Sequence, residues 1–230
     1  MQQTVAVVLS GCGVFDGSEI HEAVSTLIHL NRLGAEVHCF APDTDQPSVV
    51  NHLTGEPASD HRNILVESAR IARGHVKPLT ACNTNDFDAV FFPGGFGAAM
   101  NLCNFADKGA DCTVNADVER VLNEFHDANK PIGMCCIAPV IAAKTFGKSG
   151  GVTLTLGDES DASKAAESMG ATHKQASVTE TVTDEPNHLI TTPAYMHGNA
   201  PIHQVFEGIG QMVEQTLAMA AMTDTSGAPA

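Results

Sequence analysis

Two adjacent cysteines, Cys135 and Cys136, lie in the segment GMCCIAP at positions 133–139, where an apolar run meets a helical pattern. A reactive side chain on a sharp turn between a strand and a helix forms a nucleophile elbow, in which the next backbone N–H serves as an oxyanion donor. Either cysteine could stand at the apex. Pro139 favours Cys136, because proline is tolerated in the first helical turn and a helix from Ile137 places it there. In the alternative interpretation both cysteines are inert core residues.

A second group of polar residues follows the first apolar run, in GCGVFDGSEIHE at positions 11–22. Its glycines resemble a dinucleotide-binding GxGxxG, but Asp16 stands where the third glycine belongs, so a nucleotide-binding module is the weaker interpretation. A flexible turn with Asp16 or Ser18 as the helix cap is simpler. Glu22 falls within the first turn of the following helix, where it can face the carboxyl ends of the strands. Its alternative role is a surface carboxylate that complements the helix dipole.

A third candidate strand end carries consecutive glycines, in PGGFG at positions 93–97. Glycines after a buried strand let backbone N–H groups approach a ligand closely, which suits an anion or a developing oxyanion. Simple turn geometry would explain the same residues.

Electrostatics connects these three strand ends. A free thiol with a pKa near 8.5 is mostly protonated at pH 7, and a helix N-terminus is expected to lower the pKa of Cys136 and ionise it. Two negative charges about 4 Å apart repel by roughly 4 kcal/mol at an effective dielectric constant of 20. If Glu22 lies beside Cys136, we therefore expect the pair to share one proton, with Glu22 as a neutral acid that donates to the thiolate.

Hydrophobic periodicity predicts alternating strands and helices along the chain. The expected strands are residues 4–10, 36–41, 88–92, 131–135, 152–156, 178–182 and 189–192. The expected helices are residues 19–33, 63–73, 115–128, 138–146, 161–169 and 202–222, with a hairpin or loop at 51–56. This order predicts a flavodoxin-like three-layer α/β/α sandwich on a mostly parallel sheet, with the ligand site outside the carboxyl ends of the strands. We expect a single domain over residues 1–222 and a disordered tail over 223–230.

Composition makes several kinds of partner unexpected. The 230 residues carry 12 Lys and Arg against 27 Asp and Glu, a formal charge of -15, so binding to nucleic acid or to a membrane surface is not expected. No apolar stretch reaches the roughly 20 residues of a membrane-spanning helix, and residues 1–10 do not resemble a secretory leader. Seven cysteines, an odd number, indicate reduced thiols and a cytoplasmic protein. HEAVS at 21–25 fails the HExxH zinc pattern at Ser25, and no metal site is expected.

Five motifs together resemble the ElbB glyoxalases of the ThiJ/PfpI superfamily, which has a class I glutamine-amidotransferase-like fold. They are LSGCGVFDGSEIHEAV (9–24), NHLTGE (51–56), PGGFGAAMNLCNFA (93–106), CIAP (136–139) and TTPAYM (191–196), and the resemblance covers residues 4–222. It implies that Cys136 is the elbow nucleophile and that Glu22 is its carboxylate partner. It also implies that the backbone N–H groups of Gly95 and Ile137 form the oxyanion pocket. The implied activity is a glutathione-independent lyase of the hydro-lyase type that converts glyoxal to glycolate without cofactors, as a homodimer.

Two departures from the wider superfamily narrow the chemistry. Ile137 follows the nucleophile where many peptidase-type members have histidine, so a Cys–His dyad is not expected. His203 lacks the glutamate two residues later that glutamine amidotransferases have, which disfavours glutamine hydrolysis. His197 lies on a late loop, where it could approach the pocket or remain solvated.

A function from a different class remains open for the same thiol. An accessible low-pKa cysteine is also a target for oxidation, and Cys135 lies directly beside Cys136. The alternative to the enzyme is therefore a non-enzymatic redox sensor or stress-response protein.

Overall fold

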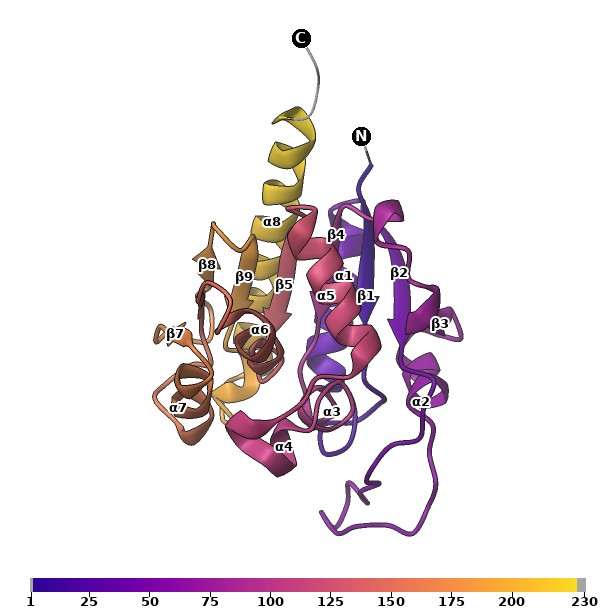
Figure 1. The fold of residues 1–230 in the computed structure, drawn as a ribbon. Coiled ribbons are helices and arrows are strands. Elements are labelled where there is room, and N and C mark those ends of the chain that lie inside the picture. The colour runs from indigo at the N-terminus through magenta and orange to yellow at the C-terminus, as the bar shows by residue number, and fades with distance from the viewer. Residues whose placement is uncertain (1, 227–230) are drawn as a thin grey trace.

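The computed structural model describes residues 2–226, which form a seven-stranded sheet between layers of helices (Figure 1). The strands of this sheet are β1 (Thr4–Val8), β2 (Glu36–Ala41), β3 (Val76–Pro78), β4 (Ala89–Phe92), β5 (Ile132–Cys135), β8 (Val182–Asp184) and β9 (Leu189–Thr192). Their order is β3-β2-β1-β4-β5-β9-β8, and all neighbours pair in parallel except β8, which runs antiparallel to β9. A separate parallel pair consists of β6 (Val152–Leu154) and β7 (Ala171–His173).

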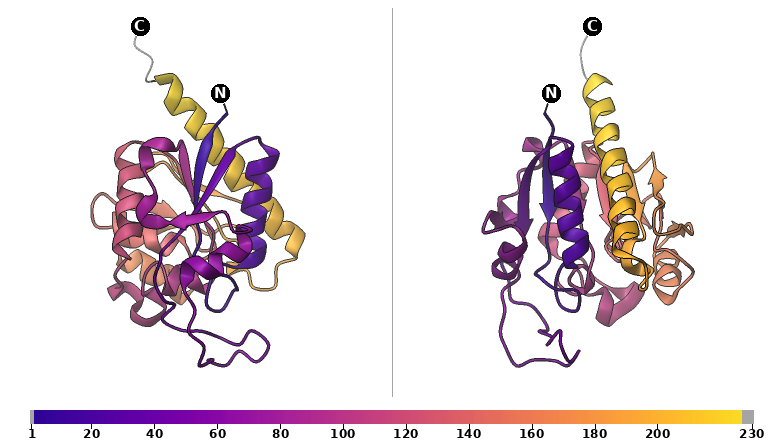
Figure 2. Two further views of the ribbon diagram at one scale, coloured as in Figure 1. Left: turned by 90° about the vertical axis from the view of Figure 1, so that its right-hand side faces the viewer. Right: turned by 180° about the vertical axis from the view of Figure 1, so that it is seen from behind.

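Helices cover both faces of the sheet. They are α1 (Ile20–Arg32), α2 (Ile64–Ile71), α3 (Phe96–Met100), α4 (Phe105–Lys108), α5 (Ala116–Asp127), α6 (Pro139–Phe146), α7 (Asp161–Ser168) and α8 (Ile202–Ser226), with 3-10 turns η1 (Leu79–Ala81), η2 (Thr84–Asp86), η3 (Gly109–Asp111) and η4 (Ala194–Met196). The helices α1 and α8 pack together on one face, and α5 and α6 lie on the other (Figure 1, Figure 2). The predicted three-layer sandwich is thereby confirmed. Within residues 2–226 no helix combines the length and the hydropathy needed to cross a bilayer.

The core has two parts because side chains of a strand alternate between the faces of the sheet. In β1, Val5 and Val7 join the cluster that contains residues of α1 and α8, whereas Ala6 and Val8 join the cluster that contains residues of α5 and α6. All four side chains are fully buried. A strand buried on both faces is a continuous apolar run, which is the pattern that predicts this element from the sequence.

The chain changes direction across the sheet between β1 and β4. From β1 it proceeds outward through β2 to β3, and it then returns to β4 on the other side of β1. Such a reversal in a parallel sheet leaves a crevice outside the carboxyl ends of the two central strands, where ligands bind. The turn after β1, the glycines after β4 and the cysteine pair at the end of β5 all lie at this edge.

Several element boundaries differ from the predictions. The elements β3, β7, α3 and α4 were not predicted, because each has only three to five residues, too few for a periodic pattern. The strand predicted at 178–182 lies at Val182–Asp184, where pairing with β9 begins.

The last helix is longer than predicted. Helix α8 continues through Ser226, four residues into the segment 223–230 predicted to be disordered, because no proline or glycine lies between positions 211 and 226. Residues 227–230 lie outside the described part of the chain.

Candidate active site

Cys136 stands at the apex of the turn between β5 and α6. The turn comprises residues 136–138, and α6 begins at Pro139, one residue after the start of the predicted helix at 138–146. Cys136 has a φ of 59°, a left-handed conformation that is strained for a residue with a Cβ. Its N–H donates to the Thr192 carbonyl at 3.0 Å, which ties the turn to β9. The structure therefore places Cys136, and not Cys135, on the elbow.

Two backbone N–H groups, those of Gly95 and Ile137, donate toward the Cys136 sulfur. Gly95 immediately precedes α3 and has a φ of 93°, a conformation that glycine adopts readily. A Cβ at this position would overlap with backbone atoms of Gly17 and Glu19. Glycine is therefore required here both by the backbone conformation and by the close approach of the neighbouring turn.

Glu22 lies in the first turn of α1 and is fully buried at the ends of the strands. Its Oε2 accepts the Gly94 N–H at 3.1 Å, and its Oε1 accepts the Tyr195 N–H at 3.2 Å. The Cys135 thiol donates to Oε2 at 3.8 Å, and the Cys136 side chain lies against Gly94 beside the same carboxyl oxygen, where the two groups affect each other's pKa. A Cβ at Gly94 would lie 2.7 Å from this carboxyl, so only glycine leaves room for it.

Burial controls the protonation of this pair. It raises the pKa of Glu22 to about 8, and the charge of Glu19 acts in the same direction. Burial, followed by the charge of Glu22, raises the pKa of the Cys136 thiol well above its usual value. The N–H groups of Gly95 and Ile137 favour the thiolate but do not offset the loss of solvent. The expectation of an ionised thiol at pH 7 is therefore wrong, whereas a neutral Glu22 agrees with its raised pKa.

The two histidines considered from the sequence occupy other surroundings. His197 Nε2 lies 2.9 Å from the Ala176 carbonyl oxygen, and its Nδ1 lies 3.6 Å from Asp158 Oδ2. His203 is exposed near the start of α8, on the surface that it shares with α1. The titratable group beside Cys136 is thus the carboxyl group of Glu22 and neither of these histidines.

Sequence reasoning missed two residues that contact Glu22. Tyr195 follows Ala194, whose φ of 45° turns the chain after β9 and directs the Tyr195 N–H at the Glu22 carboxyl. The position of this segment directly after a buried strand was the available signal, since such strand ends meet at one edge of the sheet. Glu19 caps α1 by accepting the Glu22 N–H at 2.7 Å. Its position three residues before Glu22 matches the spacing of a helix cap.

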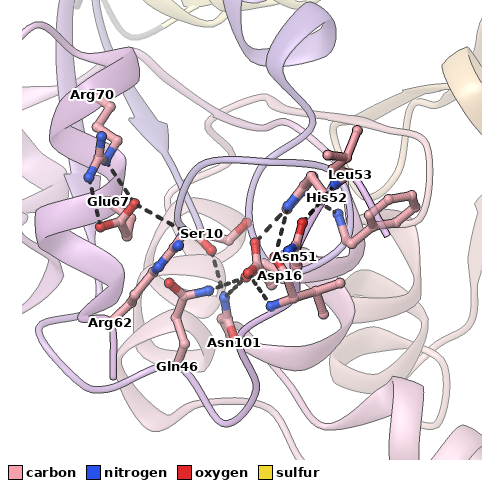
Figure 3. A network of polar contacts seen from close by, with 12 residues as sticks. Ser10, Asp16, Gln46, Asn51, His52, Leu53, Arg62, Glu67, Arg70 and Asn101 are labelled. Carbon is pink, nitrogen blue, oxygen red and sulfur yellow. Dashed lines mark hydrogen bonds and ion pairs between the residues drawn. The ribbon is translucent and has the colours of Figure 1, made fainter. Parts of the chain in front are cut away.

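The glycine-rich turn after β1 anchors a long arm, defined as residues 42–63, that extends past the carboxyl edge of the sheet (Figure 1). Asp16 is the buried centre of this anchor (Figure 3). Its Oδ2 accepts the Val50 N–H at 2.8 Å, and its carbonyl oxygen accepts Gln46 Nε2 at 2.6 Å and Asn101 Nδ2 at 2.9 Å. Asp16 therefore has a structural role in joining the arm to the turn.

The same contacts argue against a nucleotide site at this turn. The Gly11 N–H donates to a serine hydroxyl of α2 at 2.9 Å, and the Gly13 N–H donates to the Ser18 carbonyl at 2.9 Å. A pyrophosphate needs free N–H groups at a helix N-terminus. Here these glycine amides are already engaged, and Glu19, not the expected Asp16 or Ser18, caps α1.

Solved structures with a similar architecture define the class of the fold. An isoprenoid biosynthesis protein with an amidotransferase-like domain from Ehrlichia chaffeensis is 35% identical, with a TM-score of 0.87 over 94% of this chain and 99% of that chain. DJ-1beta of Drosophila melanogaster shares the fold at 17% identity, with a TM-score of 0.55 over 98% of this chain and 97% of that chain. The fold is that of amidotransferase-like and DJ-1/ThiJ/PfpI proteins.

Sequence relatives define the family within that class. The mitochondrial ES1 protein homolog of Rattus norvegicus is 51% identical, over 93% of this chain and 82% of the relative. The mitochondrial glutamine amidotransferase-like class 1 domain-containing protein 3 of Homo sapiens is 50% identical over the same shares. The chain belongs to this family of ES1 and glutamine amidotransferase-like class 1 domain-containing proteins. No family model matches it.

The names of these relatives contradict the predicted cytoplasmic location. Both are named as mitochondrial proteins, as is the ES1 protein of Danio rerio. The prediction rested on the number and scatter of the cysteines, which indicate reduced thiols but do not distinguish one reducing compartment from another.

Proposed function

We propose that this protein is a glyoxalase that converts glyoxal to glycolate without glutathione, metal or another cofactor. The supporting observation is the buried pair of Cys136 and the Glu22 carboxyl, which meet at Gly94 and raise or lower each other's pKa, with the N–H groups of Gly95 and Ile137 beside the sulfur. A thiol nucleophile, a proton-transferring carboxyl and an oxyanion pocket are the groups that this reaction needs. The resemblance to the ElbB glyoxalases points to the same reaction.

The first step forms a carbon–sulfur bond. The pair loses one proton, and the Cys136 thiolate adds to one aldehyde carbon of glyoxal while the C=O electrons move to the oxygen. The N–H groups of Gly95 and Ile137 stabilise the resulting oxyanion. Protonation of this oxygen by Glu22 gives a hemithioacetal and leaves Glu22 as a carboxylate.

The second step moves a proton between the two carbons. The Glu22 carboxylate removes the C–H proton of the hemithioacetal carbon, and an enediolate forms as the electrons shift to the second carbonyl oxygen. Glu22 returns this proton to the second carbon, and the hydroxyl proton of the first carbon passes to the second oxygen, which gives the thioester of glycolic acid. One carbon is oxidised and the other is reduced, so no external electron acceptor is needed. Water then attacks the thioester, the C–S bond breaks, and glycolate leaves with the Cys136 thiol restored.

The enclosure of the pair favours a small substrate. Cys136 is 8% exposed and Glu22 is not exposed at all. A two-carbon dialdehyde needs far less room at the sulfur than a peptide does. Glutamine hydrolysis is disfavoured because His197 and His203 are positioned elsewhere.

A substrate panel tests the proposal. Purified protein, treated with a chelator and free of glutathione, is assayed on glyoxal, methylglyoxal, glutamine and a peptide. Wild type should form glycolate from glyoxal, and Cys136→Ser should lower kcat by about a thousandfold or more. Cys135→Ser is the matched control and should retain turnover. Turnover of glutamine alone would overturn the proposal, and loss of activity in Cys135→Ser but not in Cys136→Ser would reassign the nucleophile.

The same samples separate the enzyme from the redox sensor. Oxidation follows thiolate character and exposure, and burial has reduced both at Cys136. Mass spectrometry after mild peroxide treatment should therefore show slow modification of Cys136 in protein that turns over glyoxal. Stoichiometric sulfenic or sulfinic acid, without aldehyde turnover, would favour the sensor.

A further inference from the structure

Glu19 lies between the first turn of α1 and the glycines that follow β4. Its Oε2 accepts the Glu22 N–H at 2.7 Å, and its own N–H donates to the Gly94 carbonyl at 3.0 Å. Gly94 in turn donates its N–H to the Glu22 carboxyl. Glu19 is therefore bonded both to the residue that carries the carboxyl group and to the turn that holds this group. Only 8% of Glu19 is exposed.

The charge of Glu19 acts on groups from three elements around it. It raises the pKa of Glu22 on α1, of Tyr195 on η4 and of Cys135 on β5. The nearest basic group is His21, whose Nδ1 lies 3.7 Å from Glu19 Oε1 and 2.9 Å from the Tyr195 hydroxyl. The His21 side chain is 49% exposed, so solvent screens its interaction with Glu19. The charge of Glu19 is therefore directed mainly toward the interior of the site.

We propose that Glu19 is a positioning residue of the Cys136 site that acts through Glu22, holding the Glu22 carboxyl in place and helping it to retain its proton. The catalytic consequence rests on the proposed glyoxalase function, whereas the coupling of Glu19 to Glu22 does not.

A helix cap alone does not account for a glutamate at this position. Serine, threonine, asparagine and aspartate are the preferred caps, and they hold the helix N-terminus without a long buried carboxylate. Burying a carboxylate costs solvation free energy. The charge, rather than the capping oxygen, is therefore the feature that distinguishes Glu19 from an ordinary cap.

Three variants separate the charge from the cap. Glu19→Gln keeps an oxygen that can accept the Glu22 N–H but removes the charge, whereas Glu19→Asp keeps both a charge and a cap. Glu119→Gln removes one exposed charge from α5, on the opposite face of the sheet, and is the matched control. The readout is the rate at which iodoacetamide alkylates Cys136 as a function of pH, measured by mass spectrometry of the Cys136 peptide. This readout requires no turnover.

In Glu19→Gln the Glu22 carboxyl should lose its proton at lower pH, and its charge then opposes the Cys136 thiolate. The alkylation profile should therefore shift to higher pH by about half a unit, which makes Cys136 react up to about threefold slower near pH 8. The Glu19→Asp and Glu119→Gln profiles should lie close to that of wild type. If folded Glu19→Gln has the wild-type profile, the proposal is overturned and Glu19 is only a cap. A shifted profile in protein that does not convert glyoxal would overturn the proposed function and support the positioning role.

A measurement on the wild-type protein covers the case in which Glu19→Gln does not fold. The ¹³C carboxyl resonance of Glu22 is assigned by its absence in Glu22→Gln. It should titrate near pH 8. A Glu22 carboxyl already ionised at pH 6 would overturn the proposal.

Discussion

Cys136 and Glu22 compete for protons, and the number they hold determines when the site is reactive. Burial favours the form with both protons at neutral pH, so the reactive form, a thiolate beside a neutral acid, appears as the first proton leaves. We therefore expect kcat/KM for glyoxal to rise about tenfold per pH unit below pH 8 and to level off above it. Initial rates between pH 6 and 9 check this expectation. A maximum below pH 7 would contradict it.

Glu22 should be essential for the proton transfer rather than for the fold. Glu22→Gln keeps the shape of the side chain and an acceptor for the Gly94 or Tyr195 N–H, but it cannot move a proton between the two carbons. The expected loss in kcat is about 10² to 10⁴-fold. Glu119→Gln is the control for the change in charge. Glycolate formation by Glu22→Gln within tenfold of wild type would exclude Glu22 as the acid and base.

Among the elements of the site, the turn between β4 and α3 should tolerate substitution poorly. Gly95→Ala places a Cβ at a φ of 93° and against backbone atoms of Gly17 and Glu19. Gly34→Ala, after α1, has a similar φ of 79° but open space around the Cβ, so it is the matched control. Strain should cost each variant about 1 to 2 kcal/mol of unfolding free energy. Overlap should cost Gly95→Ala about 1 to 3 kcal/mol more and remove activity. Equal losses in urea unfolding would contradict this explanation.

The arm of residues 42–63 should loosen when its anchor is removed. Asp16→Ala deletes the acceptor of the Val50 N–H, whereas Asp16→Asn can keep it. Hydrogen exchange at the Val50 amide should be faster in Asp16→Ala and close to wild type in Asp16→Asn. Unchanged exchange in Asp16→Ala would show that other contacts hold the arm.

For the molecule as a whole, the buried Glu22 makes stability depend on pH. Its pKa is about 8 in the folded chain against an ordinary 4.5, so between these values the folded state binds one more proton than the unfolded state. This contribution is complete below the lower value and is lost as the pH rises through the higher one, with a slope of at most about 1.4 kcal/mol per unit. Glu22→Gln should show a shallower decline in unfolding free energy from about pH 5 to 8. Parallel urea-unfolding curves would contradict this assignment.

The homodimer stays a prediction for the assembled molecule. Light scattering should give a mass twice the 24.1 kDa of one chain. The mass of a single chain at micromolar concentration would show that the dimer expectation is wrong.

The sequence predicts the long elements and the strand ends better than it predicts their environment. The apolar run of β1 and the glycines at Gly94 and Gly95 are local signals, and they indicate both a strand and a sharp turn. The raised pKa of Cys136 was not predictable, because it depends on burial by segments distant in the chain. The anchoring of Val50 by Asp16 was missed for the same reason, since no local pattern records a contact across 34 residues.

The hydrogen bonds from Cys136 to Thr192 and from Tyr195 to Glu22 also determine when the site can form during synthesis of the chain. Glu22, Gly95 and Cys136 are all synthesised before β9, but the acceptor and donor that complete their arrangement come from β9 and the turn that follows it. During synthesis Cys136 is therefore an ordinary accessible thiol for as long as β9 is missing. Only a chain whose last strand has docked has the buried pair, so the same docking step that shields the thiol also assembles the site.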